Sequence, residues 1–138
     1  MNLLCTLAKQ FGPLMGRILL AVIFVLAGFN KITGFAGTAG YMASKGLPMA
    51  DVLLVLTIII ELGGGLLIIV GWQARWAAAA LFLFMIPVTL VFHNFWAVEA
   101  AQQTLERIMF MKNLAIMGGM LYIVAHGSGP YSMGKDKC

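Results

Sequence analysis

One ionisable side chain, Glu61, lies in the middle of a long apolar run that covers residues 52–70. The run is long enough to cross a lipid bilayer, since a transmembrane helix needs about 20 mostly apolar residues. A charged group at the centre of such a helix costs on the order of 3 kcal/mol on insertion scales. We therefore expect Glu61 to face the interior of a helix bundle and to pair with either Lys31 or Lys112. Such a carboxylate is either a structural ion-pair member or a group that binds a ligand or exchanges protons.

A second group of polar side chains lies at the ends of the neighbouring apolar segments. In an up-and-down bundle these ends meet at the face where the Glu61 segment begins, so the side chains would line a polar funnel with Glu61 at its floor. The alternative for both lysines is that they reach toward lipid headgroups, as long basic side chains near helix ends do. The candidates for binding a ligand or handling protons are Glu61, Lys31, Lys112, His93, Asn94, Asn30, Asn113 and Trp96.

Within this group, His93, Asn94 and Trp96 form a cluster of histidine, amide and aromatic side chains. Imidazole binds metals or relays protons near neutral pH. The alternative is a histidine that ends a helix and interacts favourably with the helix dipole. Because no second histidine, cysteine or aspartate stands nearby at ligand spacing, we predict no metal site and no haem ligation.

The composition is that of an integral membrane protein. Of the 138 residues, 62% are hydrophobic and 10% are charged, whereas soluble domains have about 25% charged residues. The net charge of +4 is explained by basic residues that meet anionic headgroups, and nucleic-acid binding is not expected because no basic patch is interleaved with aromatic residues. The two cysteines, Cys5 and Cys138, lie at the termini and form no ligand or redox motif.

The hydropathy pattern predicts an all-α fold, a four-helix transmembrane bundle in a single domain over residues 1–138. The expected spans are about 13–31, 49–71, 74–92 and 107–125. Pro87 lies inside the third span, where we expect a kink. The segment 33–46 is predicted to form a short amphipathic helix at the membrane interface. The polar segment 93–106 is predicted to connect the last two spans.

Small residues are expected to form the helix contacts of this bundle, because they let two backbones approach closely. Gly64 and Gly65 share a helix face with Glu61 and are predicted to pack against the first or the last span; Gly118 and Gly119 offer the same kind of surface on the last span. Segments 64–70 and 118–124 also resemble each other, which indicates either two repeated helical hairpins or a chance match between apolar sequences.

The sidedness of the bundle follows from its basic residues. Four spans put both termini on one side, and that side carries one more basic residue than the other, which favours cytoplasmic termini. Arg17 is expected to anchor the first span to a lipid phosphate. The side of the termini carries Lys9, Arg17, Arg75, Lys135 and Lys137, and the other side carries Lys31, Lys45, Arg107 and Lys112.

An ordered set of short motifs resembles the DoxX family of small bacterial inner-membrane proteins, and within it the YphA-like subgroup. The set covers about residues 13–126. Its members are Arg17, Ala27–Lys31, Gly34–Gly37, Tyr41–Pro48, Glu61–Leu66, Gly71, Arg75 and His93–Trp96. The resemblance implies a four-helix bundle in the inner membrane and a link to quinone-dependent redox systems, but no catalytic residues can be carried over from it.

Three functions are compatible with this reading, and the sequence does not decide whether the protein is an enzyme. The first is a redox-associated membrane subunit that binds quinone or supports a partner oxidoreductase subunit, with His93 and Lys112 as hydrogen-bond donors and Glu61 as the proton-exchanging group. The second is a non-catalytic accessory or assembly protein. The third is a small transporter whose substrate meets Glu61. Formation of a homo-oligomer remains open in all three cases.

Overall fold

Four helical segments in the computed structural model, which describes residues 2–134, are long and apolar enough to cross a membrane. They run up and down, as the sequence predicts, and no strand occurs in the part of the chain that the structure describes. The elements are α1 (Leu3–Thr33), α2 (Phe35–Ser44), α3 (Ala50–Ile58), η1 (Ile59–Gly63), α4 (Gly64–Val70), α5 (Ala74–Phe92), η2 (Phe95–Ala97) and α6 (Ala100–His126).

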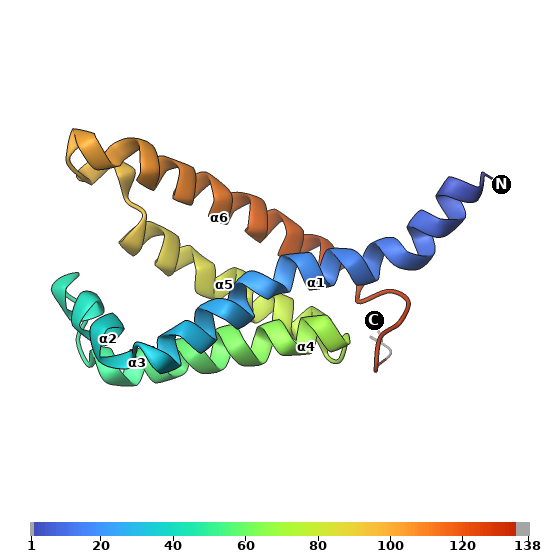
Figure 1. Cartoon of the computed structure of the whole chain (residues 1–138), viewed down its shortest axis with the longest axis horizontal. Coiled ribbons are helices and arrows are strands. Elements are labelled where there is room, and N and C mark those ends of the chain that lie inside the picture. Colours follow the sequence, from blue (N-terminus) through green and yellow to red (C-terminus); the bar gives the residue numbers. More distant parts are fainter. Residues whose placement is uncertain (1, 135–138) are drawn as a thin grey trace.

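The first and last helices begin earlier than the expected spans. The side chain of Asn2 caps α1 by accepting from the N–H of Leu4, so the helix starts about ten residues before Pro13. Its first turns point away from the bundle (Figure 1), and a proline that lacks an N–H donor is a usual cause of such a bend. α6 starts at Ala100, because alanine, glutamine, leucine and glutamate in segment 100–106 are strong helix formers.

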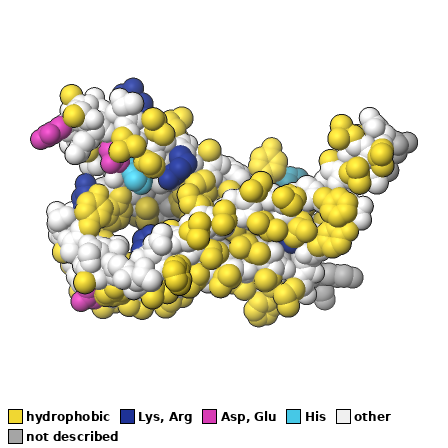
Figure 2. All heavy atoms as spheres, viewed as in Figure 1, with side chains coloured by type: hydrophobic (Ala, Val, Ile, Leu, Met, Phe, Trp, Pro, Cys, Tyr) yellow, Lys and Arg dark blue, Asp and Glu magenta, His cyan; other side chains and the backbone are white. Residues whose placement is uncertain are grey.

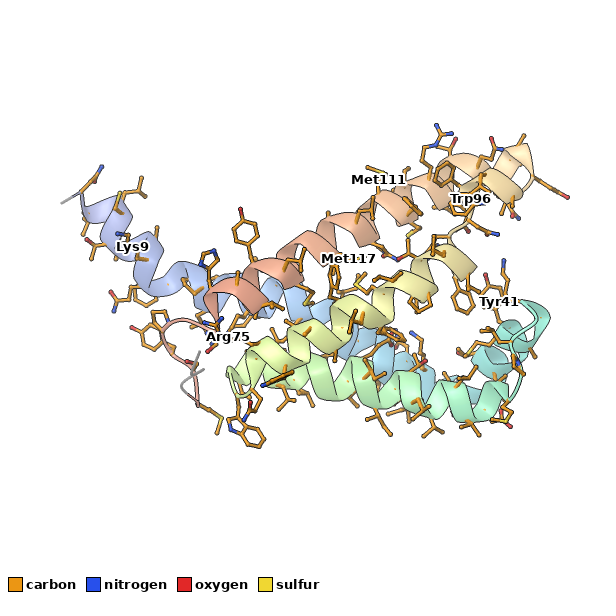
Figure 3. All side chains as sticks on the ribbon, turned by 180° about the vertical axis from the view of Figure 1, so that it is seen from behind. Lys9, Tyr41, Arg75, Trp96, Met111 and Met117 are labelled. Carbon is orange, nitrogen blue, oxygen red and sulfur yellow. The ribbon has the colours of Figure 1, made fainter. Side chains whose placement is uncertain are left out.

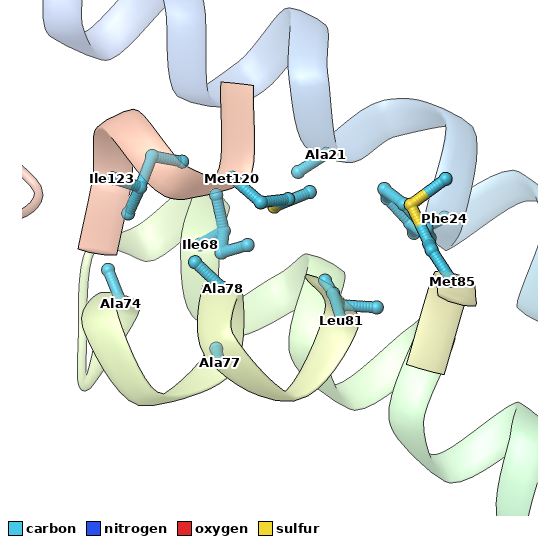
Figure 4. Close-up of a cluster of buried hydrophobic side chains, with 10 residues drawn as sticks. All are labelled: Ala21, Phe24, Ile68, Ala74, Ala77, Ala78, Leu81, Met85, Met120 and Ile123. Carbon is cyan, nitrogen blue, oxygen red and sulfur yellow. The ribbon is translucent and has the colours of Figure 1, made fainter. Parts of the chain in front are cut away.

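The helices form two closely packed pairs, which share one buried core. α1 packs along η1 and α4, α5 packs along α6, and α4 and α5 join the two pairs. On α5 the core residues recur every three or four positions, so they share one helix face (Figure 4). Most are alanines there, which lets the helices approach closely. The core consists of Ala21, Phe24, Ile68, Ala74, Ala77, Ala78, Leu81, Met85, Met120 and Ile123.

The predicted glycine contacts are distributed differently from the expectation. A Cβ at Gly65 would lie 2.9 Å from Val25 of α1, as expected, but a Cβ at Gly64 would meet Leu81 of α5 rather than the first or last span. A Cβ at Gly119 would meet Leu20 of α1 at 3.1 Å, whereas Gly118 is exposed and has open space beside it. Successive positions on a helix point about 100° apart, so only one residue of a glycine pair can face a given neighbour.

The segment predicted to lie along the membrane interface is helical, and it packs beside the first half of the second span. α1 ends at Gly34, and α2 follows directly. Ala39 and Met42 of α2 form a second buried cluster with Leu54 of α3. The chain from α1 to α2 is therefore a helix broken at Gly34, and its second piece continues alongside α3.

The end of the bundle that carries both described termini is closed by two arginines. Arg17 is only 2% exposed and donates to the carbonyl oxygens of Ser128, Pro130 (3.1 Å) and Tyr131 (2.9 Å). It therefore binds backbone carbonyls inside the protein, and the expected anchor to lipid phosphate is wrong. The segment after α6 supplies these carbonyls and covers the guanidinium, so protein encloses the side chain. Arg75 donates in the same way to the carbonyls at the end of α6.

Candidate functional site

Glu61 and Lys31 form an ion pair in the middle of the second span. The Lys31 Nζ lies 2.9 Å from Glu61 Oε2 and 3.3 Å from Oε1. Glu61 is 6% exposed and is the twelfth residue of the 21-residue span Ala50–Val70. At 1.5 Å per residue it lies roughly 16 Å below the start of that span, close to the centre of the bilayer. The partner is Lys31, not Lys112.

The backbone around Glu61 departs from the regular α-helix. Residues Ile59–Gly63 form a π-helical turn between α3 and α4, and Glu61 is its central residue. Such turns occur mainly inside α-helices at functional sites. Opposite this turn α1 comes very close, because a Cβ on Gly28 would lie only 2.9 Å from the Cβ of Leu62. Sequence reasoning missed the π turn; the only available signal was the carboxylate two residues before a run of three glycines.

A second ionisable pair joins the end of α5 to α6. His93 Nδ1 lies 2.8 Å from Glu106 Oε2, and the two side chains are 24% and 22% exposed. Glu106 was not among the candidates, because segment 93–106 reads as a connecting loop. Once residues 100–106 are helical, Glu106 projects from the first turns of α6 toward His93.

A cavity of about 260 Å³, the α2 cavity, opens beside both pairs. Its walls mix the ionisable side chains with hydroxyl and aromatic groups from α2, α3 and α5. Figure 2 shows the hollow at this end of the molecule, with basic, acidic and histidine side chains around it. The lining residues are Lys31, Thr38, Tyr41, Met42, Thr57, Glu61, Phe84, Val88, Phe92, His93 and Glu106.

A second cavity of about 200 Å³, the α6 cavity, lies between α1, α5 and α6. It shares five residues with the α2 cavity, among them Lys31, Glu61 and His93, so the two cavities lie on either side of one polar wall. Its own polar residues are Lys112 and Asn113 of α6. Beside them the lining is apolar and consists of Ile23, Phe24, Ala27, Phe84, Met85, Val88 and Ile116.

Asn113 is held in place by α5. The side chain is buried and its Nδ2 donates to the buried Oγ1 of Thr89 at 3.0 Å. Lys112, one residue earlier, lies beside the sulfur of Met109 at 3.4 Å and lines the α6 cavity with its charge available. The cationic donors toward the α6 cavity are Lys31 and Lys112.

Three of the predicted candidates lie outside both cavities. Asn30 is exposed, and its backbone carbonyl accepts from the N–H of Gly34. Asn94 has a buried Oδ1 with no hydrogen-bond partner among residues 2–134. Trp96 is 56% exposed and packs edge-on against Phe110, at the end of the molecule that also carries Tyr41 (Figure 3). A run of neighbouring polar residues at a helix end points in several directions, so only some of them reach the interior.

The arrangement can bind a small polar ring or group and exchange protons with it. A lysine ammonium has three N–H donors, and in Lys31 two of them are directed at Glu61, which leaves one for a ligand. His93 uses Nδ1 for Glu106, so its other ring nitrogen remains available. Within residues 2–134 no group of three or more His, Cys, Asp or Glu side chains is placed to hold a metal ion.

Fold and site together define a small integral membrane protein that keeps an ion pair and two cavities at membrane depth. The sequence model of the DoxX family matches residues 12–94 of this chain. The inner membrane protein YqjF of Escherichia coli (strain K12) is 40% identical over 92% of this chain and 92% of its own length. The chain therefore belongs to the DoxX family, and it is a multi-pass protein of the inner membrane.

Two further relatives extend the comparison. The inner membrane protein YphA of the same E. coli strain is 30% identical over 93% of this chain and 91% of its own length. A Surfeit locus protein 4 homolog of Schizosaccharomyces pombe (strain 972 / ATCC 24843) is 27% identical over 94% of this chain, which corresponds to 38% of that longer protein. No solved structure matches the chain.

Proposed function

We propose that the protein is a quinone-linked membrane subunit of a redox system, and that the α6 cavity binds the quinone ring. The observation that carries the proposal is the convergence of Lys31, His93, Lys112 and Glu61 on this one cavity, at the depth of the bilayer where a quinone dissolves. Three of these residues come from three different helices, so only the folded bundle brings the donors together.

The chemistry of a quinone matches this set of side chains. Each of its two carbonyl oxygens accepts hydrogen bonds, and Lys112 and His93 are donors that line the cavity. Reduction to the quinol takes up two electrons and two protons. A partner oxidoreductase subunit supplies the electrons, and Glu61 passes protons to the ring oxygens.

The size of the cavity supports a single ring as the ligand. At about 200 Å³ it is smaller than the pockets of about 300–1,000 Å³ that enclose drug-sized molecules. Apolar walls from Phe24, Phe84 and Met85 can contact the ring faces, and the polar groups can fix its orientation.

The first test is the substitution Glu61→Gln in purified protein, with quinone binding and thermal unfolding in detergent as two readouts. The amide keeps the shape of the carboxylate and its oxygen can still accept from Lys31, so we expect folding close to that of the parent and loss of quinone binding. Glu99→Gln is the matched control, because Glu99 is an exposed glutamate outside both cavities. Full binding by Glu61→Gln would contradict the proposal.

The accessory or assembly role makes the opposite prediction for the same variants. A purely structural ion pair should lose thermal stability in Glu61→Gln, and part of the loss should return when Lys31 is replaced as well. Such a protein should also co-purify with a protein partner and without quinone after gentle detergent extraction.

A transporter is the second candidate, and one observation favours it. The helix break at Gly34 follows Lys31 by three residues, and the π turn contains Glu61, so each partner of the ion pair lies on or close to a helix interruption. Secondary transporters build their substrate sites near the bilayer midplane from interrupted helices. Proton-driven uptake of a solute into vesicles that contain the purified protein, and its loss in Glu61→Gln, would support this candidate over quinone binding.

For the orientation in the membrane, we propose that both termini face the cytoplasm and that segment 93–106 faces the periplasm. Lys31 and Lys112 line a cavity, and leaving them out of the loop count strengthens the basic bias toward the side of the termini. Lys135, Lys137 and Cys138 lie outside the described residues. Reporter fusions after Cys138 and within 93–106 test the orientation, and a periplasmic C-terminus would reverse it.

A further inference from the structure

An apolar groove of about 450 Å³ lies between α1 and α6, on the side of the closed end. Its walls are helix surfaces from two segments that are distant in sequence, and the loop after α6 forms its end. The lining residues are Pro13, Gly16, Arg17, Leu20, Gly119, Tyr122, Ile123, His126, Gly127, Ser128 and Gly129. The guanidinium of Arg17 is turned to backbone carbonyls, so the groove offers a ligand mainly apolar surface.

The groove and the α6 cavity follow each other along the same seam between the two helices. On α1 the groove ends at Leu20 and the cavity begins at Ile23; on α6 the cavity ends at Ile116 and the groove begins at Gly119. A spacing of three residues keeps both steps on one helix face. The seam therefore runs from a polar part at the ion pair to an apolar part near the closed end.

Gly16 leaves open the part of the seam nearest the closed end. A Cβ added to Gly16 would have open space around it, so a helix surface without side chain borders the groove there. From Gly16 to Ala27, at the cavity, α1 rises by roughly 16 Å at 1.5 Å per residue. That length suits an extended hydrocarbon chain better than a compact ring.

We infer that the ligand of the α6 cavity is a membrane-dissolved amphiphile whose polar ring enters from the side, between α1 and α6, and whose polyisoprenoid tail lies in the apolar groove. The inference rests on the proposed function, since the quinone ring supplies the polar head. It assigns the α1–α6 seam as both the entrance from the bilayer and the site that distinguishes long-tailed from short-tailed ligands.

The test fills the groove without touching the cavity. In Gly16→Leu the new side chain projects into the groove, whereas in the control Gly118→Leu it projects from the exposed face of α6; both positions have open space for a Cβ. The probes are a benzoquinone with a single isoprene unit and the same ring with a long polyisoprenoid tail. Binding of both is measured to the full chain in lipid nanodiscs, with thermal unfolding recorded for each variant.

The parent and Gly118→Leu should bind the long-tailed quinone more tightly than the short-tailed one. In Gly16→Leu the affinity for the long-tailed quinone should fall about tenfold, which corresponds to about 1.4 kcal/mol, while the affinity for the short-tailed quinone stays unchanged. Equal affinity of the parent for both quinones, or equal losses for both in Gly16→Leu, would overturn the inference and leave the proposed function standing. Failure of the parent to bind even the short-tailed quinone would overturn both.

Discussion

Two ends of this bundle hold basic side chains in opposite ways. At the closed end Arg17 and Arg75 donate to backbone carbonyls, several of them at the end of α6 and in the segment after it. At the open end Lys31 meets the carboxylate of Glu61 beside two cavities. A carbonyl cannot change its charge, whereas a carboxylate can take up a proton. The closed end therefore holds its basic side chains with fixed dipoles, and the open end holds Lys31 with a group that can be protonated.

The choice of residue type agrees with this difference. The planar guanidinium has five N–H donors in a fixed fork and stays charged, so it suits a site with several carbonyls. The ammonium of lysine is a compact charge on a flexible stem, which suits a single carboxylate such as Glu61. The presence of a cation inside the bundle therefore does not define the chemistry of a site; the group that the cation binds defines it.

The largest effect is expected where α1 packs against α4. In Gly65→Leu the new side chain would collide with Val25 and with the carbonyl of Ala21, so α1 must move away from α4. Overpacking of a core typically costs about 1–3 kcal/mol and occasionally more. The cost should be high here, because displacing α1 disturbs its whole contact with α4 and η1. We expect little folded protein in detergent, by size-exclusion chromatography and circular dichroism. Gly64→Leu should be less severe, because Leu81 has a flexible side chain, and a Gly65→Leu protein as stable as the parent would contradict the packing described.

Arg17→Leu should have the next largest effect. Hydrogen bonds to a charged group contribute about 1.5–3 kcal/mol each, and three backbone carbonyls would lose their donor. The thermal midpoint in detergent should fall strongly, and proteolysis should become faster at segment 127–134. Arg17→Lys should restore only part of the lost thermal stability, because one ammonium cannot reproduce the fork of N–H donors of a guanidinium. Full recovery would show that charge alone matters at the closed end.

A smaller and recoverable loss is expected for Lys31→Met. Removing one partner of a fully buried ion pair costs about 3–5 kcal/mol when the other charge stays unpaired. The loss should lie below that range here, because the Lys31 side chain is 26% exposed. Adding Glu61→Gln removes that charge, so the double variant should regain part of the thermal stability. No second substitution can remove the carbonyls around Arg17, so the same rescue has no counterpart at the closed end. A double variant less stable than Lys31→Met would contradict this distinction.

The smallest effect on stability is expected at the pair of His93 and Glu106. Both side chains are partly exposed, and such pairs contribute about 0–1 kcal/mol. Glu106→Gln should therefore leave the thermal midpoint nearly unchanged. If His93 binds a quinone oxygen, His93→Ala should weaken quinone binding much more than Glu106→Gln does, and equal binding by both variants would remove His93 from the site.

Part of this architecture is visible in the apolar runs. Their length and number predict four spans, since a helix of about 20 residues is required by the thickness of the bilayer whatever the neighbours are. The helix over 35–44 is also predicted, but its place beside α3 is not, because amphipathic composition does not distinguish the membrane surface from a polar cavity. The ends of α1 and α6 were missed, since polar helix formers at a span end read as loop.

The candidate site, like the fold, can be predicted only in part from the sequence. An ionisable residue in the middle of a span must face the interior, and Glu61 does. The sequence left two lysines as its partner and grouped Asn30, Asn94 and Trp96 with the interior residues. Which of them face inward depends on the rotation of each helix about its axis, and that rotation is set by packing contacts between residues far apart in the chain.

The sequence by itself determined that this chain crosses the membrane four times, that it belongs with the DoxX proteins, and that a carboxylate lies at the centre of its second span. Only the tertiary structure decided that Lys31 is its partner, that Glu61 sits in a π turn, that His93 meets Glu106, and that two cavities share one polar wall. The free energy of placing a residue in lipid depends on that residue alone, so the spans can be predicted from the local composition. Pairing and cavities arise between helices, where shape and register select among several chemically suitable partners.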